Sequence, residues 1–159
     1  MELERRIAPS PWTLEDGRGN HRILLRVSEA SPYVHMSVKW RRRDYNPENT
    51  ALVLIHNETE TKVANILPVK LTREQGEIFF EAPYAGEYAL YYYPYYQKSK
   101  NWWFPIVDYT WDNVEKADAA WVENVPAEAP EAEVICEESR TEFDSFYPME
   151  VPATSAESQ

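Results

Sequence analysis

The residues with the clearest potential for binding chemistry form a block of ten aromatic side chains between Tyr91 and Trp111. The candidate contact residues in it are Tyr91, Tyr93, Tyr95, Tyr96, Trp102 and Trp103. Aromatic faces stack on the apolar C–H faces of sugar rings, while Lys98, Lys100 and Asn101 could bond to sugar hydroxyls. Strand alternation buries only about half of such a run. The block therefore predicts either a carbohydrate platform or an apolar domain interface, and we favour the interface because exposed aromatic patches commonly mark contacts.

A second group of functional side chains lies at a predicted chain reversal. Its members are Trp40, Arg41, Arg42, Arg43, Asp44 and Asn46. Guanidinium groups stack on aromatic rings and bind carboxylates through paired hydrogen bonds, and both partners are abundant here. Asp44 and Asn46 can bond to their own backbone, and Pro47 restricts the turn that follows. We interpret the segment as a structural corner rather than a nucleic-acid patch, because nucleic-acid binders carry a basic excess over a whole face.

The other candidate catalytic or metal-binding residues give only weak evidence for a site. The histidines are His21, His35 and His56. They fall on separate predicted strands without the local ligand pairs of a zinc site, so we expect isolated and mostly surface side chains. The neighbouring acids Glu137 and Glu138 are expected to be solvated, which would leave them untuned as acids. With four glycines and no Gly-rich phosphate loop, the chain predicts no nucleotide site, no cofactor and no metal.

Charge is distributed unevenly along the 159 residues, whose net charge is -11. Residues 1–111 contain 14 basic and 14 acidic side chains, whereas residues 112–159 contain 2 basic and 13 acidic ones. The whole surplus therefore lies in the last third, which predicts an acidic, weakly ordered or partly helical tail. Cys136, the single cysteine, lies in this tail. We expect a spectator thiol whose pKa is raised by its acidic surroundings.

Length and hydropathy limit the possible classes further. A chain of 159 residues has room for one domain and a tail but not for an ordinary barrel enzyme of about 250 residues. The first residues are charged, and no run approaches the roughly 20 apolar residues of a membrane span. We therefore expect no membrane partner, no nucleic-acid partner and, by default, a cytoplasmic location.

Alternation of apolar and polar residues predicts a series of short strands. They cover residues 21–27, 33–40, 51–56, 62–67, 69–72, 77–81 and 87–93. The 51–56 segment is apolar throughout, as expected when both faces are covered. We expect hairpins between 51–56 and 62–67 and between the last two strands, where Gly86 lies, and a short helix over 118–124 with Asp118 as its cap.

This pattern predicts an all-β fold, an antiparallel sandwich of the jelly-roll kind. Residues 1–20 would form an N-terminal arm and residues 21–111 the sandwich. Residues 112–159 would be an acidic linker that leads toward a further domain.

Seven motifs are spread between Gly19 and Glu150. They are Gly19-Asn20-His21-Arg22, the 40–48 corner, Asn65-Ile66-Leu67, the 73–80 segment, Gly86-Glu87-Tyr88, the 91–95 segment and the 143–150 segment. Together they resemble the N-terminal domain of glycoside hydrolase family 123-like proteins. The resemblance implies a C-terminal barrel domain, joined in cis, that removes N-acetylgalactosamine from glycans with an acidic pair and the acetamido group of the substrate. No position here matches that pair, so we expect no catalytic residue and no enzyme activity.

Several functions remain open at this point. The favoured one is a non-catalytic accessory domain that packs on or assists a glycan-cleaving catalytic domain. A carbohydrate-binding module would use the aromatic block, and its partners would be glycans. A truncated or free-standing protein-interaction domain is a further alternative. A free-standing enzyme is least favoured, because it would need convergent carboxylates such as Asp44, Glu48 or Asp108.

Overall fold

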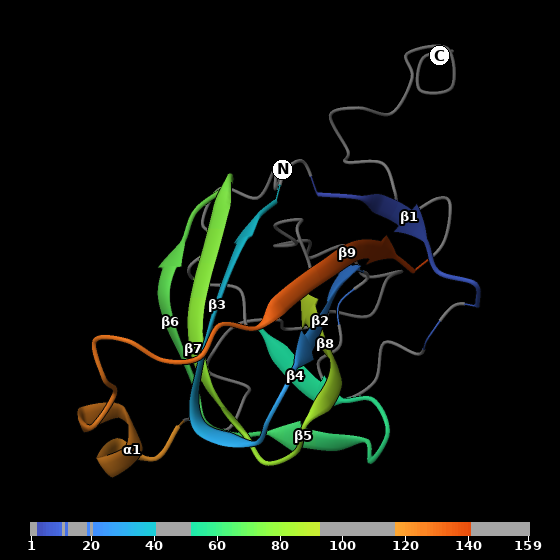
Figure 1. Cartoon of the computed structure of the whole chain (residues 1–159). Coiled ribbons are helices and arrows are strands. Elements are labelled where there is room, and N and C mark those ends of the chain that lie inside the picture. Colours follow the sequence, from blue (N-terminus) through green and yellow to red (C-terminus); the bar gives the residue numbers. More distant parts are fainter. Residues whose placement is uncertain are drawn as a thin grey trace, which may run out of the picture.

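Two β-sheets form the core of the protein in the computed structural model, which describes residues 3–10, 12, 19, 21–40, 52–92 and 117–140. The strands are β1 (Arg5–Ile7), β2 (His21–Val27), β3 (Ser31–Lys39), β4 (Val53–His56), β5 (Thr61–Val63), β6 (Ile66–Leu71), β7 (Gln75–Ala82), β8 (Gly86–Tyr92) and β9 (Glu133–Ser139). One short helix, α1 (Ala119–Glu123), lies beside the smaller sheet (Figure 1). The predicted all-β sandwich is confirmed.

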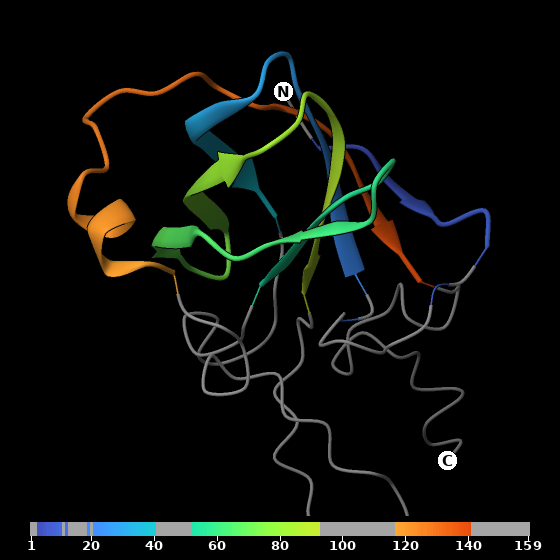
Figure 2. The same cartoon turned by 90° about the horizontal axis from the view of Figure 1, so that it is seen from below.

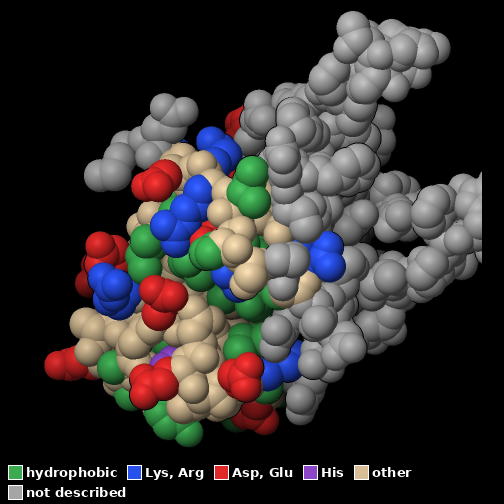
Figure 3. All heavy atoms as spheres, turned by 90° about the vertical axis from the view of Figure 1, so that its right-hand side faces the viewer, with side chains coloured by type: hydrophobic (Ala, Val, Ile, Leu, Met, Phe, Trp, Pro, Cys, Tyr) green, Lys and Arg blue, Asp and Glu red, His purple; other side chains and the backbone are tan. Residues whose placement is uncertain are grey.

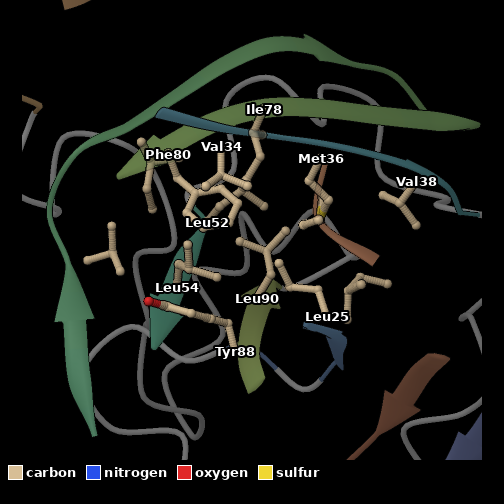
Figure 4. Packing of buried hydrophobic residues seen from close by; sticks show 14 of the residues in the cluster. Leu25, Val34, Met36, Val38, Leu52, Leu54, Ile78, Phe80, Tyr88 and Leu90 are labelled. Atoms are coloured by element: carbon tan, nitrogen blue, oxygen red, sulfur yellow. The ribbon is translucent and has the colours of Figure 1, made fainter. Parts of the chain in front are cut away.

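The larger sheet has the strand order β1-β9-β2-β8-β4-β5 and the smaller one the order β3-β7-β6. All neighbouring strands are antiparallel except β1 and β9, which are parallel. Side chains from both sheets meet in the main core, where Met36 and Ile78 of the smaller sheet face Leu25 and Leu90 of the larger one (Figure 4). Such interdigitation of two inner faces is what holds a β-sandwich together.

A second apolar cluster covers the opposite, outer face of the larger sheet. Leu24, Val53, Ile55 and Tyr91 lie in this cluster, and Trp12 of the N-terminal arm packs on them. The residues of β4 are therefore buried on both faces, which confirms the expectation drawn from its uniform apolar sequence.

One predicted strand and one predicted hairpin are wrong. The expected 62–67 strand is divided between β5 in the larger sheet and β6 in the smaller one, so only the β4–β5 hairpin is confirmed. The connection between β7 and β8, which includes Gly86 with a φ of 120°, crosses from one sheet to the other instead of closing a hairpin. Because both sheets face the same core, alternation identifies the buried face of a strand but not its sheet.

The expectation of a solvated acidic tail is wrong for residues 133–139. These residues form β9, which pairs antiparallel with β2 and parallel with β1. The predicted helix is confirmed, since the Asp118 carboxylate accepts a hydrogen bond from the Trp121 amide at 3.2 Å and caps α1. In the part of the chain that the structure describes, no helix is both long and apolar enough to cross a membrane.

Candidate functional site

The strands β2, β3, β4, β8 and β9 each have one end on the same side of the sandwich. We refer to this side as the junction end and define it by His21, Trp40, Val53, Tyr92 and Ser139. His21 lies opposite both Tyr92 and Ser139 in the larger sheet, and Val53 is paired one position away. The Trp40 ring lies 5.0 Å from that of Tyr92, so β3 ends there too. Figure 2 shows these strand ends on one side of the molecule. Segments 41–51, 93–116 and 141–159 follow described residues at this end of the sandwich.

Only two of the predicted site residues belong to the described part of the chain, namely Trp40 and Tyr91. The others lie outside the described residues; they are Arg41, Arg42, Arg43, Asp44, Asn46, Tyr93, Tyr95, Tyr96, Trp102 and Trp103. The roles assigned to these ten residues stay predictions.

Trp40 is a buried part of the core at the junction end, with 3% of its surface exposed. Its indole N–H donates to the Thr72 carbonyl at 2.8 Å, and its ring lies against Gly76. The close approach leaves no room for a side chain at position 76, because a Cβ there would lie 2.6 Å from the ring. Trp40 therefore anchors the start of the predicted corner.

Tyr91 is also buried, on the outer face of the larger sheet. Its ring makes an edge contact with Trp12 at 5.4 Å, and its hydroxyl accepts a hydrogen bond from Arg22 Nη1 at 3.2 Å. A ring enclosed in this way has no free face for a sugar. The hypothesis of a carbohydrate platform therefore depends on the members of the aromatic block that follow Tyr91.

A cluster of ion pairs surrounds the buried carboxylate of Glu138, whose side chain is 1% exposed. Arg22 donates to Glu138 Oε1 from Nε at 2.8 Å and from Nη2 at 2.5 Å, and Arg6 Nε donates to Oε2 at 2.7 Å. The Arg22 guanidinium also lies 4.4 Å above the Trp12 ring. One carboxylate thus joins β1, β2 and the N-terminal arm to β9.

Glu137 points to the opposite face of β9, toward the main core, because successive side chains of a strand alternate. The Tyr92 hydroxyl donates to its carboxylate, and Arg5 Nε lies 3.3 Å from Oε1. The expectation that Glu137 and Glu138 are solvated is therefore wrong. Both carboxylates bind arginines from strands that are distant in the sequence, so the acidic local sequence did not predict these ion pairs. Since the two carboxylates lie on opposite faces, they cannot act together on one substrate.

The histidines are less exposed than the sequence predicts. His21 and His56 are each 2% exposed, which corrects the expectation of mostly surface side chains. His56 bridges two turns, with Nδ1 2.8 Å from Thr59 Oγ1 and Nε2 2.9 Å from the Ala85 carbonyl. Among the described residues, no group of three or more His, Cys, Asp or Glu side chains could hold a metal ion.

Residues 10–140 match the family model described as "Glycoside hydrolase 123, N-terminal domain". The chain belongs to this family. The match includes the corner, the aromatic block and β9. No curated protein and no solved structure matched the chain in the corresponding comparisons.

Cys136 of this glycoside hydrolase 123 N-terminal domain is buried on the outer face of the larger sheet. Burial raises the pKa of its thiol, Arg6 opposes the shift, and Glu138 and other nearby acids add to it. The predicted direction of the pKa shift is confirmed, but desolvation rather than acidic surroundings is its main cause. A buried thiol with a raised pKa is a poor nucleophile.

An open groove of about 460 Å³ lies between β3 and the β1–β9 pair. Val38 and Val134 contribute apolar surface, while Glu4 and Lys39 add charges of opposite sign. Figure 3 shows basic and acidic side chains interspersed over the described part of the face that carries β1. Neither feature provides the convergent carboxylates of a hydrolase active site or a basic surface for nucleic acid.

Proposed function

We propose that this chain is a non-catalytic accessory domain that packs on and supports the glycan-cleaving catalytic domain of a glycoside hydrolase 123 protein. The observation that carries the proposal is the convergence of strand ends at the junction end. The rest of the predicted corner follows Trp40, the rest of the aromatic block follows Tyr92, and the chain leaves β9 after Ser139. The chain therefore continues into the predicted corner, the rest of the aromatic block and any domain joined after β9 from the same end of the sandwich.

The chemistry of the described residues supports a structural rather than a catalytic role. Glu137 and Glu138 are both engaged with arginines and face opposite sides of β9. A glycosidase acid needs a carboxyl group that faces the scissile bond together with a second carboxyl group nearby. The buried ion pairs instead join β1, β2 and β9, which gives the junction end a fixed frame for an interface.

The proposal can be tested in trans with the separately produced catalytic domain of a glycoside hydrolase 123 protein. We expect the chain to bind that domain in calorimetry and to raise its Tm. The chain alone should not hydrolyse an aryl N-acetyl-β-galactosaminide. A Trp102→Ala, Trp103→Ala variant should lose binding while its own urea midpoint stays unchanged. Absence of binding and of any Tm change would overturn the proposal.

A matched control for the aromatic block is Tyr84→Ala, because Tyr84 is an aromatic residue with 44% exposure in the β7–β8 turn, away from the junction end. Its removal should leave docking unaffected. A parallel titration with N-acetylgalactosamine-containing oligosaccharides, followed by tryptophan fluorescence, checks the carbohydrate alternative. Saturable glycan binding that is lost in the double tryptophan variant, without docking, would assign the block to sugar recognition.

A further inference from the structure

Residues 117–132, which we term the strap, start beside Asn65, pack on Tyr33 of β3, pair with His35 and then lead into β9. The strap contains α1, which lies beside the smaller sheet in both cartoon views (Figures 1 and 2). Its first half is held by Trp121, whose ring stacks on Tyr33 at 5.0 Å with an interplanar angle of 17°. Trp121 Nε1 donates to the Pro32 carbonyl at 2.7 Å, and the Tyr33 hydroxyl donates to the Trp121 carbonyl at 2.8 Å. The side chains in these contacts are an indole and a phenol.

The second half of the strap is held at His35. The His35 amide donates to the Pro130 carbonyl at 2.8 Å, and the Ala132 amide donates to the His35 carbonyl at 2.8 Å. These two bonds form a single parallel bridge opposite Glu131. A bridge of two backbone bonds is a small contact, so the side chains around it strongly affect its stability.

The His35 imidazole lies between two carboxylates from different parts of the fold. Its Nε2 is 2.7 Å from Glu77 Oε2 on β7, and its Nδ1 contacts Glu131 Oε1 on the strap. A neutral imidazole has only one N–H, so it could donate to one carboxylate while its other nitrogen presented a lone pair to the second. Both contacts are hydrogen bonds only when the ring carries two protons and a positive charge.

The neighbouring strands also bring a cation and an aromatic ring to this site. On the third strand of the small sheet, Lys70 is in register with Glu77, and the ring of Phe79 lies 4.9 Å from the imidazole. Burial is the largest single influence and lowers the pKa of His35. Hydrogen bonds and charges from Glu77 and Glu131 outweigh it, so the pKa of His35 lies above its usual value.

We propose that His35 is a pH-sensitive latch that fastens the second half of the strap to the smaller sheet. In the closed state the imidazolium joins Glu131 of the strap to Glu77 of β7. Loss of one proton removes one hydrogen bond and leaves a lone pair facing a carboxylate, which loosens the bridge at residues 130–132. The stacked contact of Trp121 with Tyr33 keeps the first half of the strap in place, so opening is local.

The sign of the pH effect follows from linkage. A histidine whose pKa is higher in the folded state than in the unfolded state stabilises the fold fully below the unfolded value of about 6.5. This contribution is lost as the pH rises through the folded pKa. The latch is therefore closed in mildly acidic solution and open in alkaline solution, with at most a tenfold change in bridge stability for each unit of pKa difference.

The test is amide hydrogen exchange on the whole chain between pH 5.5 and 8.5, corrected for the intrinsic exchange rate, together with NMR titration of the His35 ring. We expect protection of the Ala132 amide to fall as His35 loses its proton. The fall should be at most tenfold for each unit by which the measured pKa of His35 exceeds about 6.5. The His35→Gln variant should show the same protection at every pH. A His35 pKa at or below the usual value, or pH-dependent protection that persists in His35→Gln, would overturn the proposal.

Two further variants separate the latch from general loosening of the strap. Glu131→Gln removes the charge on the strap and should reduce the pH dependence at Ala132. Tyr33→Phe removes only the hydrogen bond to the Trp121 carbonyl, so it should lower protection near α1 equally at all pH values. A pH-dependent effect of Tyr33→Phe that equals that of Glu131→Gln would contradict a specific role for His35.

Discussion

Replacement of Glu138 by Gln tests whether the ion pairs of β9 stabilise the sandwich. The substitution keeps the size of the side chain but removes the negative charge that Arg6 and Arg22 share. Arg22 is held in place by the Trp12 ring and by its hydrogen bond to Tyr91. Its guanidinium would therefore remain at the covered outer face of the sheet without a balancing carboxylate.

The expected loss follows from the exposure of each partner. Removal of one member of a fully buried ion pair costs roughly 3–5 kcal/mol. The side chains of Arg22 and Arg6 are 19% and 49% exposed, so both regain some hydration. We therefore expect Glu138→Gln to lower the free energy of unfolding by about 2–3 kcal/mol.

Glu133→Gln provides a matched control on the same strand. Glu133 lies 4.0 Å from Arg26, and their side chains are 71% and 57% exposed. An exposed pair of this kind contributes less than about 1 kcal/mol. Urea unfolding, followed by circular dichroism and tryptophan fluorescence, should shift the midpoint strongly for Glu138→Gln and little for Glu133→Gln, with the slope unchanged. Equal losses for the two variants would refute the structural role assigned to the buried cluster.

Three other predictions concern Gly76, Cys136 and Asp118. Gly76→Ala should destabilise the fold by about 1–3 kcal/mol in urea unfolding, because the new Cβ would meet the buried Trp40 ring; a neutral result would show that the ring can move. Cys136 should resist iodoacetamide at pH 7.5 in the native protein and react in urea, since burial raises the pKa of its thiol; rapid native labelling would contradict its burial. Asp118→Ala should cost about 1 kcal/mol locally and speed exchange of the Trp121 amide, because it removes the cap of α1.

Local sequence patterns predicted individual strands well. The bounds of β2 agree with the predicted strand over residues 21–27, and the alternation from Val34 to Trp40 identified the buried face of β3. The pattern did not predict which strands would pair. Side-chain alternation depends on the two faces of one strand, whereas pairing depends on contacts between segments far apart in the sequence.

The environment of the acidic residues in β9 could not be predicted from the local sequence either. Glu137 and Glu138 follow Cys136 in a segment with a large acidic surplus, which is typical of a solvated tail. Their solvation is prevented by Arg5, Arg6 and Arg22, which lie more than 100 residues earlier in the sequence. A net charge of -11 therefore does not describe the electrostatic environment of these carboxylates. Only the fold brings the opposite charges together.

The stability of the sandwich and the proposed docking are assigned to different residues, so they can be tested separately. The buried cluster around Glu138 holds β9 in the sheet, and the proposed interface lies in segments that follow Trp40 and Tyr92. If both assignments are correct, Glu138→Gln should lower the urea midpoint but bind the catalytic domain normally at temperatures where it remains folded. Trp102→Ala, Trp103→Ala should show the reverse pattern. Loss of binding in a fully folded Glu138→Gln variant would instead mean that the ion-pair cluster itself shapes the interface.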